Sequence, residues 1–166
     1  MPKLVGIMGH AGSGKDTVAN MLVLHHGYEK FAIADSLRYI ARHVDSQLDE
    51  IVWELGWDTA KKDPKVRRLL QNLGAAIRHE FGETFLLHHV IGKCDENSVI
   101  SDVRTKAEAT WLLGAGGILL KVVRPGVGPV NDDITDQDVD IPCTILHNAG
   151  TLEDLATIVD YTFGGF

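Results

Sequence analysis

The chain has 166 residues, 45% of them hydrophobic and 23% charged, which is the composition of one soluble globular domain with room for a proper core. Its formal net charge of −7 argues against broad adhesion to nucleic acid or to anionic membranes. Two cysteines make neither a disulfide framework nor a zinc site, and no apolar run is long enough to span a bilayer.

Short apolar runs alternate with stretches of helical spacing along most of the chain. Strands are expected at residues 3–8, 28–34, 97–104, 116–125 and 143–148. Helices are expected at residues 15–26, 35–44, 46–57, 63–81, 83–94, 105–115 and 150–163, with Asp35, Asp63 and Thr151 as caps. This alternation predicts an α/β fold whose mainly parallel sheet is covered by helices on both faces.

A glycine-rich segment, Gly9-x-x-x-x-Gly14-Lys15, follows the first expected strand and opens the first expected helix. Glycines in this context let backbone N–H groups converge on phosphate oxygens at the positive end of the helix. Lys15 would reach the β- and γ-phosphates of a nucleotide. The alternative is a glycine-rich turn before an ordinary helix. The residues expected to bind ATP here are Gly12, Ser13, Gly14, Lys15, Asp16 and Thr17.

Asp16 stands where the general phosphate-binding motif has a hydroxyl residue. A carboxylate beside a polyphosphate is repelled unless a cation lies between them. We therefore expect Asp16 to be a ligand of Mg²⁺, directly or through water, and Thr17 to bond the α-phosphate. The other interpretation is a carboxylate that merely complements the helix dipole.

The segment "GHAGSGKDT", residues 9–17, resembles the loop of the phage deoxynucleoside monophosphate kinases, in which aspartate also follows the lysine. Some phosphomevalonate kinases have a similar loop. The resemblance implies a P-loop kinase fold with a mainly parallel five-stranded sheet and helices on both faces. It also implies one domain, residues 1–166, with a helical acceptor-binding insertion at about 35–95 and a short lid at about 124–142.

Two further segments resemble the acceptor side of that family. "FAIADSLR" implies that Asp35 and Arg38 bind the acceptor, although alone it could be a helix cap followed by a solvated arginine. "RRLLQNLGAAIR" implies the same role for Arg68, Gln71 and Arg78, which share one helix face. Guanidinium groups suit phosphate and an amide suits the edge of a base, whereas the alternative is an ordinary polar helix face.

The segment "VISDVRTKAEA" resembles the family's sequence after a central strand. It implies that Asp102 holds Mg²⁺ through water or orients the site, and that Arg104 clamps the acceptor phosphate. A bare Asp-x-Arg at a strand end could equally be an ion pair.

The last resemblances concern the lid and the base of ATP. "KVVRPG" implies that Arg124 closes over the transferring phosphoryl group. "ILHNAGTLEDL" implies that His147, Asn148 and Gly150 line the adenine.

These features predict a phosphotransferase that moves the γ-phosphoryl of ATP to a deoxynucleoside monophosphate, giving the diphosphate and ADP. Lys15, Arg104 and Arg124 would be its catalytic residues, with Mg²⁺ as cofactor. The expected partners are small nucleotides, not nucleic acid or membrane. The sequence does not decide whether the chain forms a homodimer. The expected compartment is the cytoplasm, that of the host if the protein is phage-encoded. The rivals are another small-molecule P-loop kinase, similar to phosphomevalonate kinase, and a nucleotide-dependent switch protein that docks a partner.

Overall fold

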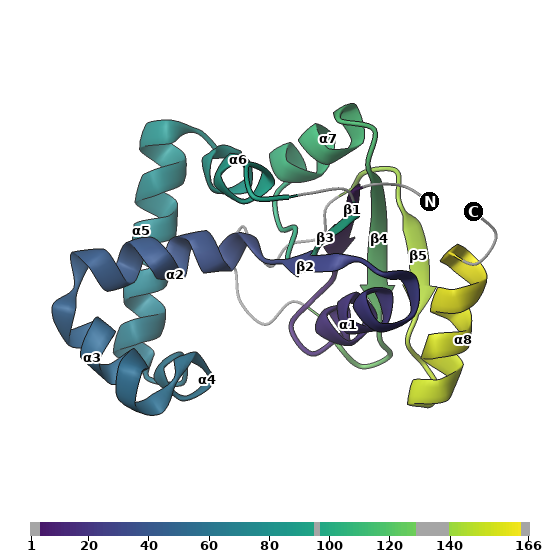
Figure 1. Cartoon of the computed structure of the whole chain (residues 1–166), viewed down its shortest axis with the longest axis horizontal. Coiled ribbons are helices and arrows are strands. Elements are labelled where there is room, and N and C mark those ends of the chain that lie inside the picture. Colours follow the sequence, from purple (N-terminus) through teal and green to yellow (C-terminus); the bar gives the residue numbers. More distant parts are fainter. Residues whose placement is uncertain (1–3, 95–96, 129–139, 164–166) are drawn as a thin grey trace.

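A computed structural model describes residues 4–94, 97–128 and 140–163 of the chain (Figure 1). Within that part, five strands form one sheet in the order β2-β3-β1-β4-β5, and every neighbouring pair is parallel. The strands are β1 (Leu4–Met8), β2 (Glu29–Phe31), β3 (Ser98–Ile100), β4 (Ile118–Val123) and β5 (Thr144–His147). The parallel α/β sheet expected from the sequence is thus confirmed.

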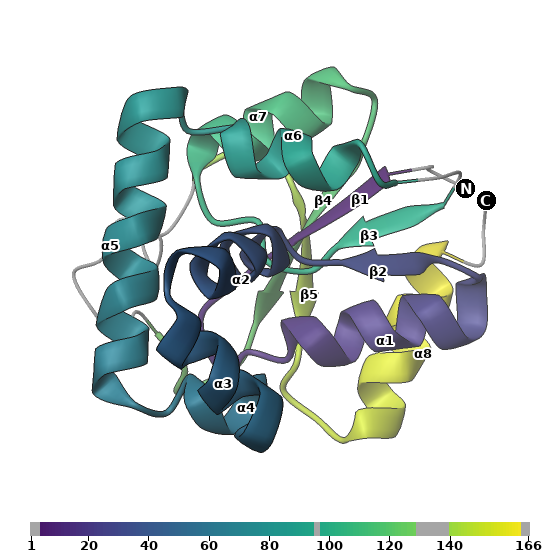
Figure 2. The same cartoon turned by 60° about the vertical axis from the view of Figure 1, so that its left-hand side comes forward.

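Helices cover both faces of this sheet, as Figures 1 and 2 show from two directions. The helices are α1 (Lys15–His26), α2 (Ile33–Val44), α3 (Ser46–Leu55), α4 (Trp57–Ala60), α5 (Pro64–Phe81), α6 (Phe85–Ile91), α7 (Lys106–Gly114) and α8 (Leu152–Phe163). Helices α1 and α8 pack side by side on one face, around residues such as Ile7, Leu22 and Phe163. Helices α6 and α7 contribute to the core on the other face.

The helical part between β2 and β3 has a small apolar cluster of its own. Its buried members come from α2, α3, α4 and α5: Ala41, Leu48, Val52, Ala60 and Val66. Helix α2 connects this cluster to the sheet, because it begins directly after β2 and packs against both α5 and α6. No described helix combines the length and apolar character needed to cross a membrane.

The register of the sheet brings the functional segments to one edge. Gly6 of β1 pairs with Ile100 of β3 and with Leu119 of β4. The three central strands are therefore aligned in register. Because the strands are parallel, all of their carboxyl ends lie at the same edge. The loops that follow β1, β3, β4 and β5 therefore converge there, and together with the first turn of α1 they hold most of the expected site residues.

Two of the three expected helix caps are present in the structure. Asp63 accepts a hydrogen bond from the Lys65 amide, with Pro64 in the first turn of α5, and Thr151 exchanges hydrogen bonds with Asp154, so both caps are confirmed. The second strand, however, ends at Phe31 and α2 already begins at Ile33. Asp35 therefore lies inside the first turn and does not cap α2.

Candidate functional site

The loop between β1 and α1 has the backbone that its glycines predict. Gly9, Gly12 and Gly14 have φ angles of 142°, 81° and 102°, a region that strains any other residue. Two of them are also needed for space. A Cβ at Gly9 would lie 2.5 Å from the Val122 carbonyl oxygen, and one at Gly14 would lie 2.5 Å from Nδ2 of Asn148. The loop is therefore packed closely against the ends of β4 and β5.

Side chains and main chain hold this loop in shape. Nδ2 of Asn148 donates to the Ser13 carbonyl at 2.9 Å, which joins the end of β5 to the loop. Nζ of Lys15 donates to the His10 carbonyl at 2.8 Å, so the lysine curls back across the loop from the first turn of α1. The hydroxyl of Ser13 is buried and has no hydrogen-bond partner among the described residues. Asn148, expected near the adenine, thus has a supporting role in the loop itself.

Asp16 points outward from the first turn of α1. Its Oδ1 lies 2.8 Å from Nζ of Lys30 on β2, and 78% of its side chain is exposed. Lys30 also donates to Oδ1 of Asn20 at 3.1 Å. Thr17, the next residue, is half-buried. Asp16 could offer Mg²⁺ its second carboxylate oxygen, and the remaining ligands would then be water and nucleotide phosphates.

Asp102 joins the sheet to the helical part by capping α2. Its Oδ1 accepts from the Ile33 amide at 2.6 Å and its Oδ2 from the Ala34 amide at 2.9 Å, although these residues lie 69 and 68 positions away in the chain. Burial raises the pKa of this carboxyl, against the lowering effect of the two amides. Because both oxygens are occupied and the residue is buried, contact with a metal would have to pass through water.

Glu108, which the sequence analysis did not single out, connects two arginines of the site. Its fully buried side chain accepts hydrogen bonds at Oε2 from the amides of Arg104, at 2.9 Å, and Thr105, at 3.0 Å. Its Oε1 lies 3.9 Å from Nη2 of Arg78. Thr105 completes a capping box for α7. The Thr-x-x-Glu spacing of such a box is visible in the sequence and could have identified Glu108.

We expect the contribution of Glu108 to stability to fall as the pH rises. Burial raises the pKa of its carboxyl, so the folded state favours the protonated form. That contribution is complete below the unfolded-state pKa and is lost as the pH rises through the folded-state pKa. The unfolding free energy of wild type minus that of Glu108→Gln should therefore decrease as the pH rises above the ordinary pKa of a glutamate, about 4.3.

Urea unfolding at several pH values measures this difference. Glu50→Gln, which removes an exposed carboxylate from α3, is the matched control. A difference between wild type and Glu108→Gln that grows with rising pH would contradict the assignment.

The acceptor residues expected on α5 do not all point the same way. Arg68 and Gln71 are exposed, whereas Arg78 turns inward toward Glu108 with only 18% of its side chain exposed. Gly74, one turn earlier, leaves room for that guanidinium, because a Cβ there would lie 3.2 Å from Nη1 of Arg78. The carboxyl group of Glu108 thus faces the guanidinium of Arg78 with one oxygen and holds the main chain at Arg104 with the other.

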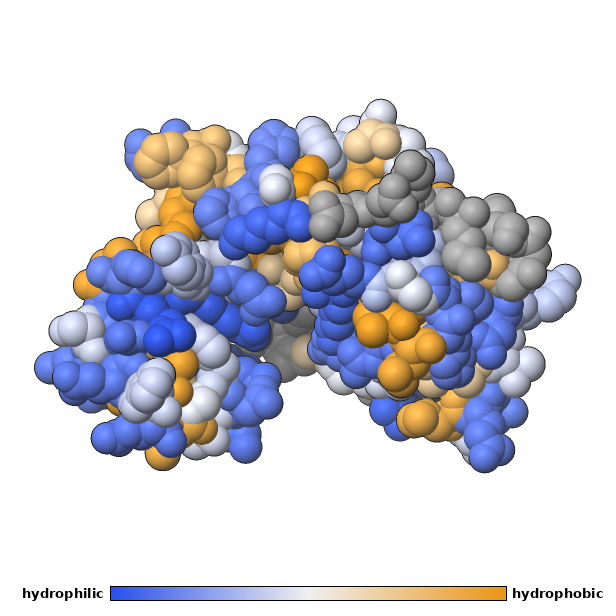
Figure 3. Space-filling view, viewed as in Figure 1, coloured by the Kyte–Doolittle hydropathy of each residue, from blue (hydrophilic) through white to orange (hydrophobic). Residues whose placement is uncertain are grey.

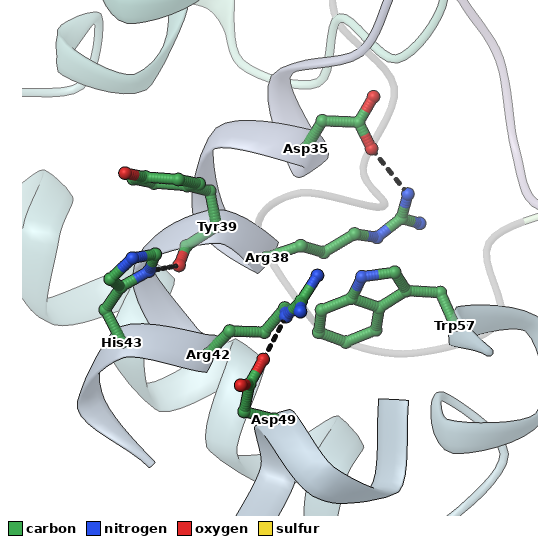
Figure 4. Close-up of a pocket in the computed structure, with 7 residues that line it drawn as sticks. All are labelled: Asp35, Arg38, Tyr39, Arg42, His43, Asp49 and Trp57. Atoms are coloured by element: carbon green, nitrogen blue, oxygen red, sulfur yellow. Dashed lines mark hydrogen bonds and ion pairs between the residues drawn. The ribbon is translucent and has the colours of Figure 1, made fainter. Parts of the chain in front are cut away.

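Asp35 and Arg38 lie on a different surface, in a pocket of about 440 Å³ between α2, α3 and α4 (Figure 4). Nη1 of Arg38 lies 2.7 Å from Oδ1 of Asp35, and its guanidinium lies over the ring of Trp57, 5.7 Å from the centroid. The pocket is lined by Asp35, Arg38, Tyr39, Arg42, His43, Asp49 and Trp57. The space-filling view shows the molecule hollowed between this helical part and the part that carries α1 and α8 (Figure 3).

The remaining expected residues follow β4 and β5. Arg124 is exposed directly after β4, in a turn closed by the hydrogen bond from the Val127 amide to its carbonyl. Most of the expected lid, residues 129–139, lies outside the described residues. His147 is the last residue of β5 and Gly150 lies in the loop that follows it, and both residues are exposed. A Cβ at Gly150 would lie 2.5 Å from Oδ2 of Asp154, so this glycine lets the cap of α8 close.

A five-stranded parallel sheet with a phosphate-binding loop after its central strand has the fold of a P-loop kinase. No family model matches the chain. It is 27% identical to a protein of Acanthamoeba polyphaga mimivirus named "Putative deoxynucleotide monophosphate kinase", over 83% of this chain and 81% of that protein.

Two solved structures have a similar fold. Protein TT1252 of Thermus thermophilus is 18% identical, with a TM-score of 0.52 over 99% of this chain and 98% of its own. A protein of Chloroflexus aurantiacus, whose structure is described as that of a "putative kinase", is 13% identical, with a TM-score of 0.50 over 99% of this chain and 95% of its own. These likenesses concern the fold.

Proposed function

We propose that the protein transfers the γ-phosphoryl group of ATP to a deoxynucleoside monophosphate, giving ADP and the diphosphate. The observation that carries this proposal is the loop after β1, whose glycines take positive φ angles beside Lys15 at the start of α1. Such a loop binds the phosphates of a nucleotide. The likeness to the mimivirus protein supports a monophosphate as the acceptor.

In this reaction an oxygen of the acceptor phosphate attacks the γ-phosphorus, and the bond from that phosphorus to the β–γ bridging oxygen breaks. Lys15 would give up its hydrogen bond to the His10 carbonyl and donate to the β- and γ-phosphates. Arg104 and Arg124, both exposed at the carboxyl ends of β3 and β4, would bind the acceptor phosphate and the transferring group. Mg²⁺ bound to ATP would neutralise phosphate charge, with Asp16 as the protein ligand nearest the loop.

The acceptor would lie between the sheet edge and the helical part. Asp102 and Glu108 would not touch it, but they hold the elements that do. Asp102 fixes the start of α2, and Glu108 fixes the main chain at Arg104 and faces the side chain of Arg78. The acceptor site would therefore depend on two buried carboxyl groups, Asp102 just after β3 and Glu108 in α7.

The experiment that tests this proposal measures ADP release from ATP and Mg²⁺ with each dNMP, each matching NMP, and phosphomevalonate. We expect release with one or more dNMPs well above that with ATP alone. Activity with phosphomevalonate and with no nucleotide would favour the other kind of small-molecule kinase. Slow release that no acceptor stimulates would favour a switch protein.

A further inference from the structure

We propose that the pocket between α2, α3 and α4 binds the nucleobase of the acceptor, with Trp57 as its stacking surface and the Arg42–Asp49 pair as the group that reads the edge of the base. This inference rests on the proposed function and names residues that neither the sequence motifs nor the comparisons assign.

The charges of the pocket point to an uncharged ligand group. Two arginines and two aspartates line it, and each arginine is already paired: Arg38 with Asp35, and Arg42 with Asp49 (Figure 4). A phosphate placed here would meet a carboxylate beside each guanidinium. An uncharged planar ring that both donates and accepts hydrogen bonds meets no such repulsion.

The pocket also has aromatic walls. Trp57 lies beside the side chains of both arginines, while Tyr39 and His43 stand on the other side of Arg42 (Figure 4). The ring of Tyr39 is available, since 57% of this residue is exposed. Stacking on aromatic rings and guanidinium planes is how proteins bind the faces of unpaired bases. A volume of about 440 Å³ is within the range of small-molecule sites.

Among the described residues, the Arg42–Asp49 pair still has hydrogen-bonding groups to offer. Its hydrogen bond joins Nε of Arg42 to Oδ1 of Asp49, and 37% and 49% of their side chains are exposed. The terminal N–H groups of Arg42 and the second oxygen of Asp49 thus lie next to each other as donors and acceptor. Each of the four bases presents a donor beside an acceptor along one edge, an amino group in adenine, cytosine and guanine and the N3–H group beside O4 in thymine. The pair can therefore hold the edge of any of the four bases.

The pocket extends along α2, away from the edge of the sheet where the phosphate of the acceptor would bind. Asp35 is in the first turn of α2, next to the two amides that Asp102 caps. From Asp35 to His43 the helix rises about 12 Å, away from that edge. A nucleotide lying along α2 would have its phosphate near Arg104 and its base beside Trp57.

Kinetics of paired tryptophan variants test this placement. We expect Trp57→Leu to raise the KM for the dNMP about tenfold and to leave the KM for ATP unchanged. Trp53→Leu is the matched control, because Trp53 lies one helix earlier, is 84% exposed and does not line the pocket. It should change neither constant. If wild type phosphorylates dNMPs and the two variants behave alike, the pocket assignment is overturned and the proposed function stands.

A binding measurement gives an answer even if wild type phosphorylates no dNMP, an outcome that would overturn the proposed function. The chain has three tryptophans, so Trp53→Phe with Trp111→Phe leaves Trp57 as the only one. Saturable quenching of its fluorescence by a dNMP, but not by ATP alone, would support the pocket. No quenching by any dNMP would overturn it.

Asp49→Asn in the same background tests the reading of the base edge. We expect it to weaken the binding of each dNMP that wild type binds by about fivefold. Unchanged binding of all four would overturn the role assigned to Asp49.

Discussion

Replacing Lys15 by methionine should abolish phosphoryl transfer, with a fall in kcat of about 10³-fold or more. The ammonium group is the cation placed by the loop itself, at the first residue of α1, and methionine keeps the length of the side chain without the charge. The fold should survive, because the bond from Nζ to the His10 carbonyl contributes only about 1 kcal/mol.

Steady-state kinetics together with thermal unfolding separate these two effects. Lys93→Met, which removes an exposed lysine after α6, is the control and should keep normal activity. If a Lys15→Met variant is folded and its kcat is within tenfold of the wild-type value, Lys15 does not have the proposed catalytic role.

Replacing Asp102 by alanine should lower the free energy of unfolding by about 3 kcal/mol, because two buried amides, those of Ile33 and Ala34, lose their acceptor. We expect Asp102→Asn to lose about half as much, since its one remaining oxygen can accept one of the two bonds. Dissociation of α2 from the sheet edge should also reduce turnover, because α2 carries Asp35 and Arg38.

Urea unfolding measures the stability change, and a magnesium titration of activity separates capping from metal binding. If Asp102 acts only as the cap of α2, both variants should need no more Mg²⁺ than wild type. A raised Mg²⁺ requirement in a stable Asp102→Asn variant would support the water-mediated metal role. An Asp102→Ala variant as stable as wild type would show that the cap matters little.

The local features of this fold could be predicted from the sequence. The spacing from Gly9 to Lys15 predicted the loop, and Asp63-Pro64 predicted the start of α5, because both depend on neighbours in the chain. The start of α2 could not be predicted in this way. Asp35 has the right composition for a cap, but the acceptor that reaches those amides is Asp102, 69 residues from Ile33.

The site residues also divide into those that depend on neighbours in the chain and those that depend on how elements pack. Glu108 could have been predicted from the sequence, because its capping box is a local pattern. The Asn148 contact with Ser13 joins residues 135 positions apart in the chain. The Arg42–Asp49 pair spans only seven positions, but it depends on the angle between α2 and α3, which no spacing in the sequence predicts. The inward turn of Arg78 likewise depends on Glu108, which lies in another helix.

The small apolar cluster shared by α2, α3, α4 and α5 has a consequence for how such a protein can diversify. Because these helices share an apolar cluster separate from the core of the sheet, residues on their outer surfaces can be exchanged without repacking the sheet. A change of acceptor would then require substitutions in one region of the chain, and the loop that holds ATP could stay as it is. Selectivity and phosphoryl transfer would be inherited as separate modules, joined at the start of α2 and at the buried carboxylate of Glu108.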